Sequence, residues 1–160
     1  SPVSCQILGW VSSIDLSIGP EDKFKNPEFK EFMDAFYLNI PEERNARIHE
    51  LHVQTLNFKN EDIATIINKA KQTNAYIDLN KLKQFDINMF NNVSKEKKIE
   101  FVDFFHKILN DKKAKYNVDL NINYPKEPDK FFDYWINQFH INGEKSIKRA
   151  LQTIYSAKNK

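Results

Sequence analysis

Two histidines one helical turn apart are the side chains that could most readily share a metal ion. His49 and His52 lie in the segment His-Glu-Leu-His, at positions i and i+3 of an expected helix. A zinc site needs a third protein ligand and usually a fourth, and in the HExxH pattern the histidines are four residues apart. We therefore interpret the pair as surface histidines, and the sequence predicts no metal and no cofactor.

Candidate catalytic groups are scattered along the chain. His106 follows Asp103 by one helical turn, so the carboxylate could orient the imidazole ring, but an exposed pair on a helix surface has the same spacing. Cys5 could act as a nucleophile only if the fold supplied a base. Most carboxylates fall in the first turns of expected helices or beside lysines, as surface and capping charges do. The sequence therefore predicts that the protein is not an enzyme.

Glycine is rare, and this argues against nucleotide-binding folds. The 160 residues include only Gly9, Gly19 and Gly143. Loops that bind phosphate through their backbone amides need several closely spaced glycines. The distribution therefore disfavours folds of the Rossmann and P-loop kinds.

Positive charge is concentrated in the C-terminal part of the chain. Residues 94–160 carry 14 Lys and Arg against nine Asp and Glu, whereas the whole chain has a net charge of +2. A solvated surface accounts for this asymmetry, but the basic side chains could also contact phosphates, as in a winged-helix-like nucleic-acid-binding module. The candidate nucleic-acid-binding residues are Lys112, Lys113, Lys115, Lys145, Lys148 and Arg149.

A Phe-rich helix over residues 94–110 is the expected centre of the fold. Ser94 is a suitable N-cap for it. Its apolar residues cover more than half of the helix circumference, which predicts burial on two sides. The segments 29–36 and 131–139 carry phenylalanines at helical spacing and are expected to pack against it.

A second helix boundary is expected near the C-terminus. Asn142 and Gly143 resemble a helix stop, because glycine suits the left-handed position that follows a helix. The sequence therefore predicts that the helix carrying residues 131–139 ends there and that a separate last helix follows over 144–157.

The clearest strand signal lies at residues 116–124, where apolar and polar side chains alternate over nine positions. A strand cannot satisfy its own backbone hydrogen-bonding groups, so it needs partners, and 14–18 and 75–79 are the candidates. If neither pairs with it, the open edge could add a strand from another protein. The candidate protein-binding residues are the apolar positions Tyr116, Val118, Leu120, Ile122 and Tyr124.

The expected fold is mainly α with a minor β component (α+β). About six helices would surround the central helix 94–110, beside a small sheet of two or three strands that includes 116–124. A chain of 160 residues fits a single compact domain, with a potential subdivision near residues 92–94.

These features favour a non-catalytic protein-interaction domain, part of a larger assembly, with another protein as its partner. The aromatic residues, which make up 13% of the chain, exceed what a small core needs, so some are expected on a binding surface. A nucleic-acid-associated module is the alternative, and a carrier with an apolar cavity among the Phe-rich helices is the second alternative.

Two further expectations concern location. No stretch approaches the roughly 20 apolar residues of a membrane span, so no membrane partner is predicted. A single cysteine leaves no internal disulfide, which favours an intracellular protein. The chain begins at Ser1 without a methionine, which leaves a removed targeting segment or a larger parent protein open.

Overall fold

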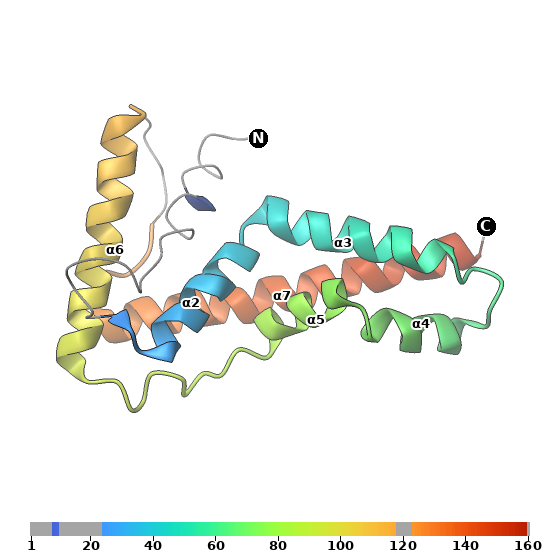
Figure 1. The fold of residues 1–160 in the computed structure, drawn as a ribbon, viewed down its shortest axis with the longest axis horizontal. Helices are drawn as coiled ribbons and strands as arrows, with labels where there is room; N and C mark the ends of the chain where they lie inside the picture. Colours follow the sequence, from blue (N-terminus) through green and yellow to red (C-terminus); the bar gives the residue numbers. More distant parts are fainter. Residues whose placement is uncertain (1–7, 10–23, 118–122, 160) are drawn as a thin grey trace.

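The protein is helical throughout the part that the structure describes. The computed structural model describes residues 8–9, 24–117 and 123–159, and every regular element within these ranges is a helix. The six long helices are α2 (Pro27–Leu38), α3 (Pro41–Leu56), α4 (Ile63–Lys71), α5 (Asn74–Lys83), α6 (Lys95–Lys115) and α7 (Pro128–Lys158). Helix α7 runs along the long axis of the molecule and contacts each of the other five (Figure 1).

Local sequence explains where the helices begin. Proline occupies the start of α2, α3 and α7, where its missing amide hydrogen costs nothing and its fixed φ suits the helix. Asp62, Thr73 and Ser94 cap α4, α5 and α6, each side chain accepting a hydrogen bond from a backbone amide of the first turn. The N-cap predicted at Ser94 is therefore confirmed.

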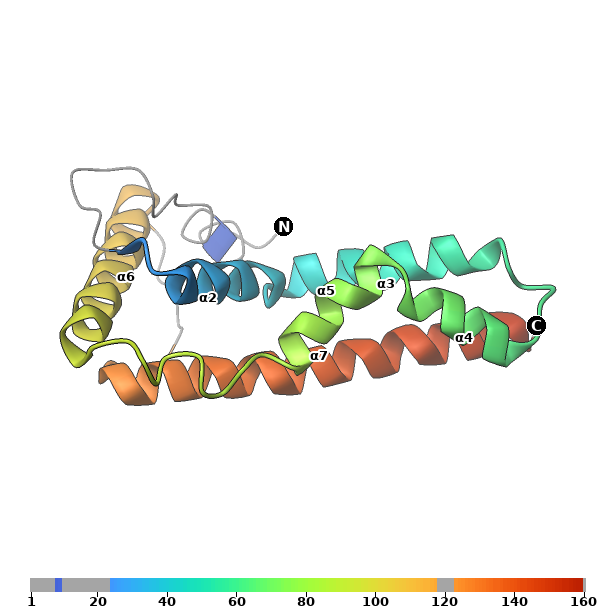
Figure 2. The ribbon, with the colours of Figure 1, turned by 60° about the horizontal axis from the view of Figure 1, so that its bottom comes forward.

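Aromatic rings fill the first of two hydrophobic cores, which joins α2, α6 and the first half of α7. Phe29 of α2 stacks on Phe101 of α6 with 4.5 Å between ring centroids, and Phe105 of α6 meets Phe131 of α7 at 5.2 Å. The packing predicted for the Phe-rich helix is confirmed by these contacts. The central position predicted for this helix is wrong, because α6 stands at one end of the molecule and α7 connects the two cores (Figure 2).

A second, mainly aliphatic core lies toward the other end of α7. Leu51 of α3, Leu79 of α5 and Ile147 of α7 are among the buried residues that meet there. Near the end of α7, the ammonium group of Lys158 donates hydrogen bonds to two backbone carbonyls of the α3–α4 connection, at 2.9 and 2.6 Å. One continuous helix therefore takes part in both cores, and a subdivision near residues 92–94 stays a prediction.

The strand predicted at 75–79 is wrong, because these residues belong to α5. The Thr73 hydroxyl accepts a hydrogen bond from the Tyr76 amide at 3.2 Å and so starts the helix. Ala75, Leu79 and Leu82 follow at positions i, i+4 and i+7 and are buried. A short apolar run fits either a helical or a strand period, and burial of this face against α3 and α7 favours the helix.

The helix end predicted at Asn142 and Gly143 is also wrong, since α7 continues unbroken through both. The Asn142 side-chain amide donates a hydrogen bond to the side-chain oxygen of Asn39 at 2.9 Å. Gly143 is buried where α7 passes the end of α5, and a Cβ there would lie 2.5 Å from the Lys83 amide nitrogen and 2.9 Å from Leu82 Cβ. The glycine therefore permits a close approach of two helices rather than a left-handed helix end.

The predicted α+β class is wrong, because no strand occurs among the described residues. Where the strand 116–124 was expected to start, α6 ends instead: Tyr116 is its C-cap, and Asn117 has a φ of 49°, in the left-handed region. Residues 118–122 and the strand predicted at 14–18 lie outside the described residues. The described part of the chain is therefore all-α.

Candidate functional site

A groove of about 600 Å³ lies between α2 and α5. Two of its walls are single faces of these helices, because Asp34 and Leu38 follow one another at helical spacing on α2, as Ile77 and Lys81 do on α5. The rest of the lining comes from the end of α4 and from residues 84–89, which follow α5. The lining comprises Glu31, Asp34, Ala35, Leu38, Lys71, Tyr76, Ile77, Asn80, Lys81, Gln84, Phe85, Asp86 and Met89.

Apolar side chains are accessible within this groove. Ile77 is 41% exposed, and Leu38 and Met89 are half-buried. Apolar surface gathered in a concave site is typical of places where a partner binds. Methionine adds adaptability there, because its unbranched side chain can follow the shape of different occupants.

Charged side chains surround the apolar part of the groove, and acids prevail among them. Glu31, Asp34 and Asp86 contribute three carboxylates, against the two ammonium groups of Lys71 and Lys81. None of the three carboxylates takes part in an ion pair within the described residues. The groove therefore offers unpaired negative charge next to accessible apolar surface.

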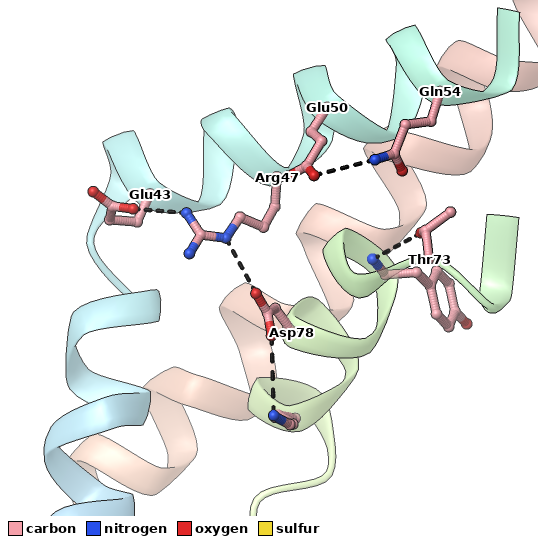
Figure 3. Close-up of polar contacts among 8 residues, drawn as sticks. Glu43, Arg47, Glu50, Gln54, Thr73 and Asp78 are labelled. Atoms are coloured by element: carbon pink, nitrogen blue, oxygen red, sulfur yellow. Dashed lines mark hydrogen bonds and ion pairs between the residues drawn. The ribbon is translucent and has the colours of Figure 1, made fainter.

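An ion-pair network between α3 and α5 positions the α5 wall (Figure 3). Arg47 of α3 bonds Glu43 through Nη1 at 2.7 Å and Asp78 of α5 through Nε at 3.3 Å. The second oxygen of Asp78 lies 4.0 Å from Nζ of Lys81, which lines the groove. Such partly exposed pairs each contribute on the order of 0.2–1 kcal/mol. The network therefore orients the α5 side chains more than it stabilises the fold.

The structure describes two of the five residues proposed for strand addition. Tyr116 is 40% exposed at the end of α6. Tyr124 is half-buried, and its ring contacts Phe105, Phe131 and Trp135. The other three, Val118, Leu120 and Ile122, lie outside the described residues. Protein binding by this set stays a prediction, with Tyr124 already engaged in packing between α6 and α7.

His106 is hydrogen-bonded to Tyr124, with 2.8 Å between Nδ1 and the phenol oxygen. Burial raises the pKa of Tyr124 to about 12. Burial also lowers the pKa of His106, assisted by the charge of Lys126 and opposed by that of Asp103. In its uncharged form, the hydrogen-bonded pair of His106 and Tyr124 therefore holds the segment before α7 against α6.

The lowered pKa of His106 predicts that acid destabilises the protein. Between the ordinary value of 6.5 and the lower value of the folded state, the unfolded chain binds more protons, so the free energy of unfolding falls as the pH falls through that window. Urea unfolding at about pH 7.5 and about pH 5 measures this loss, and we expect a smaller one in His106→Gln. Equal losses in both proteins would contradict this role of His106.

The six residues proposed for nucleic-acid binding form two groups. They are Lys112, Lys113 and Lys115 in the last turn of α6, and Lys145, Lys148 and Arg149 within α7. The α6 group lies at the end of the helix that points away from α7 (Figure 1). In the other group, Lys148 pairs with Glu144 at 3.4 Å. The structure thus does not bring the two groups together, and nucleic-acid binding stays a prediction.

The two histidines of α3 do not form part of a metal site in the described ranges. His49 is exposed and His52 is half-buried on α3, and no group of three His, Cys, Asp or Glu side chains there could hold a metal ion. Within the same ranges, no helix combines the length and the apolar character needed to cross a bilayer.

Sequence reasoning missed the groove because one of its walls was expected to be a strand. The signal for a helix was present: Thr73 is a good N-cap, and Ala75, Leu79 and Leu82 have helical spacing. That pattern would have placed Ile77 and Lys81 on the opposite, accessible face. The groove itself also depends on how α2 and α5 pack, which no local pattern shows.

Comparisons with protein-family models, with curated proteins and with solved structures found no match for this chain. The side chains of the groove are therefore the basis for assigning a function.

Proposed function

We propose that the protein is a non-catalytic interaction domain that binds a segment of a partner protein in the groove between α2 and α5. The observation that carries this proposal is the accessible apolar surface of Leu38, Ile77 and Met89 inside this groove. Grooves between helices commonly accept the apolar face of an amphipathic segment. Full burial of an exposed isoleucine contributes roughly 1.5–3 kcal/mol, and Ile77, which is 41% exposed, would gain about two-fifths of that.

The composition of the lining favours binding over catalysis. The described lining contains no histidine, the commonest general base, and none of the hydroxyl or thiol side chains of Ser, Thr and Cys that serve as nucleophiles. Its charges instead suit recognition. The unpaired carboxylates of Glu31, Asp34 and Asp86 would attract Lys or Arg on the partner and would steer its approach.

The partner segment is thus expected to combine apolar anchor residues with positive charge. An apolar anchor would fill the space beside Ile77 and Met89, while a Lys or Arg on the same segment would reach Asp34 or Glu31. Repulsion from the three carboxylates would exclude acidic segments, which provides specificity as well as attraction.

Selection from a random peptide library against the purified protein tests this proposal. We expect the enriched peptides to carry Lys or Arg next to apolar residues. Replacement of Ile77 with Lys should weaken their binding about tenfold or more, because it removes an apolar anchor contact and adds a positive charge that repels the Lys or Arg of the peptide. The free energy of unfolding should change by less than about 0.5 kcal/mol, because Ile77 is at the surface.

Ile99→Lys is the matched control for that experiment. Ile99 is also a helical isoleucine, 38% exposed on α6, and it does not line the groove. Peptides that bind Ile77→Lys and Ile99→Lys equally well, or a selection that enriches no shared pattern, would contradict binding in the groove.

A further inference from the structure

Helix α3 lies along α7 (Figure 1), and one arginine from each helix makes a hydrogen bond at the start of α3. Arg44 lies near the start of α3, half-buried, and its Nε donates a hydrogen bond to the Asn39 carbonyl at 3.0 Å. Arg149 of α7 reaches across to α3, where its Nη1 donates to Oδ1 of Asn45 at 3.1 Å. Asn39 also accepts a hydrogen bond from Asn142 of α7, so the contacts at Asn39 and Asn45 align the start of α3 with residues 142–149 of α7, and both arginines lie along this stretch of the α3–α7 contact.

Neither guanidinium has a carboxylate partner within the described residues. Their hydrogen bonds go to a backbone carbonyl and to a side-chain amide, both neutral, and neither arginine occurs among the ion pairs. Burial, together with the positive charge of Arg149, lowers the pKa of Arg44. Lys145 lies one turn before Arg149 on α7 and also lacks an ion pair within the described residues. A bound anion would relieve the repulsion among these charges.

We propose that Arg44 and Arg149 form a binding site for a single phosphate group, with Lys145 as an additional contact. Each guanidinium is oriented by one hydrogen bond and keeps further N–H donors for a ligand. Planar guanidinium groups match the oxygens of phosphate in pairs of parallel hydrogen bonds, which makes arginine the preferred side chain for this recognition. A phosphate on a small molecule and a phosphate on a phosphorylated side chain present the same chemistry to such a site.

The distribution of charge favours one phosphate over a nucleic-acid backbone. Beside the site, Lys148 is already paired with Glu144 at 3.4 Å. The lysines at the end of α6 lie elsewhere on the molecule, so they do not extend the site into a track. A nucleic-acid surface needs several phosphate contacts in sequence, whereas this site consists of two arginines and one lysine.

Titration of the protein with inorganic phosphate, followed through the arginine side-chain Nε–Hε signals in NMR spectra, tests the proposal. At constant ionic strength with chloride as the balancing anion, we expect saturable shifts of the Arg44 and Arg149 signals. Arg149→Gln should weaken phosphate binding about tenfold or more, and Arg149→Lys should weaken it less. Arg149 is exposed, so its replacement should leave the melting temperature nearly unchanged.

Lys107→Gln is the control, because it removes one positive charge from an exposed position on α6. Shifts that rise linearly without saturation, or that are the same in Arg149→Gln and Lys107→Gln, would overturn the proposal.

A phosphoserine peptide that binds more tightly than its unphosphorylated form and than inorganic phosphate would support the site and assign it to phosphorylated proteins. Saturable binding of inorganic phosphate, without tighter binding of the phosphoserine peptide, would support the site and assign it to small phosphorylated molecules. Affinity for single-stranded oligonucleotides that grows with their length would overturn the single-phosphate site in favour of nucleic acid.

Discussion

Phe32→Ala is expected to lower the free energy of unfolding by about 3–5 kcal/mol. Phe32 is fully buried at the centre of the aromatic core and belongs to α2. Its ring contacts six others, Phe36, Phe90, Phe101, Phe131, Phe132 and Phe139, at centroid distances between 5.3 and 6.4 Å. Truncation removes all of these contacts and leaves a cavity that stiff, interlocked aromatic rings cannot easily close.

Chemical denaturation followed by circular dichroism measures this loss. Tyr155→Ala is the control, because Tyr155 is an aromatic residue of α7 that is 49% exposed, and such surface substitutions usually change stability by about 0.5 kcal/mol or less. A loss below about 1 kcal/mol for Phe32→Ala would contradict the packing of α2 between α6 and α7.

Gly143→Ala is expected to destabilise the protein by about 3 kcal/mol, which is opposite to its effect in an open helix. In the interior of an unobstructed helix, alanine is favoured over glycine by about 1 kcal/mol. Here the added Cβ would lie 2.5 Å from the Lys83 amide nitrogen and 2.9 Å from its Cα. These are backbone atoms, so α5 and α7 would have to move apart to relieve the overlap.

The sign of this change is the informative result. Asn137→Ala, at an exposed position of the same helix, is the control and should stabilise the protein slightly through helix propensity alone. A stabilising effect of Gly143→Ala in thermal or urea unfolding would show that α5 does not approach α7 closely at this point.

Sequence reasoning was most successful where the residues that predict a helix and its packing face lie within a single segment. Ser94 predicted the start of α6, and the phenylalanines of residues 29–36 and 131–139 predicted which helices meet it. In each case the capping residue or the apolar period is local, and burial only reinforces it.

It failed where two segments decide the outcome together. Gly143 has the same sequence neighbours whether it ends a helix or allows two helices to touch, and only the position of α5 distinguishes these roles. Residues 75–79 could fit either period until their contacts with α3 and α7 are known. The candidate sites were hidden for the same reason, because the groove requires α2 beside α5, and the arginine pair requires Arg44 beside Arg149.

The most direct test of the proposed function is to map a library-selected peptide onto the protein by amide chemical shifts in ¹H–¹⁵N NMR spectra. Binding in the groove predicts that the largest changes fall on the facing surfaces of α2 and α5, at residues such as Asp34, Leu38, Ile77 and Lys81. Changes centred on Tyr116 and Tyr124, or on any other surface, with the groove unaffected, would contradict it.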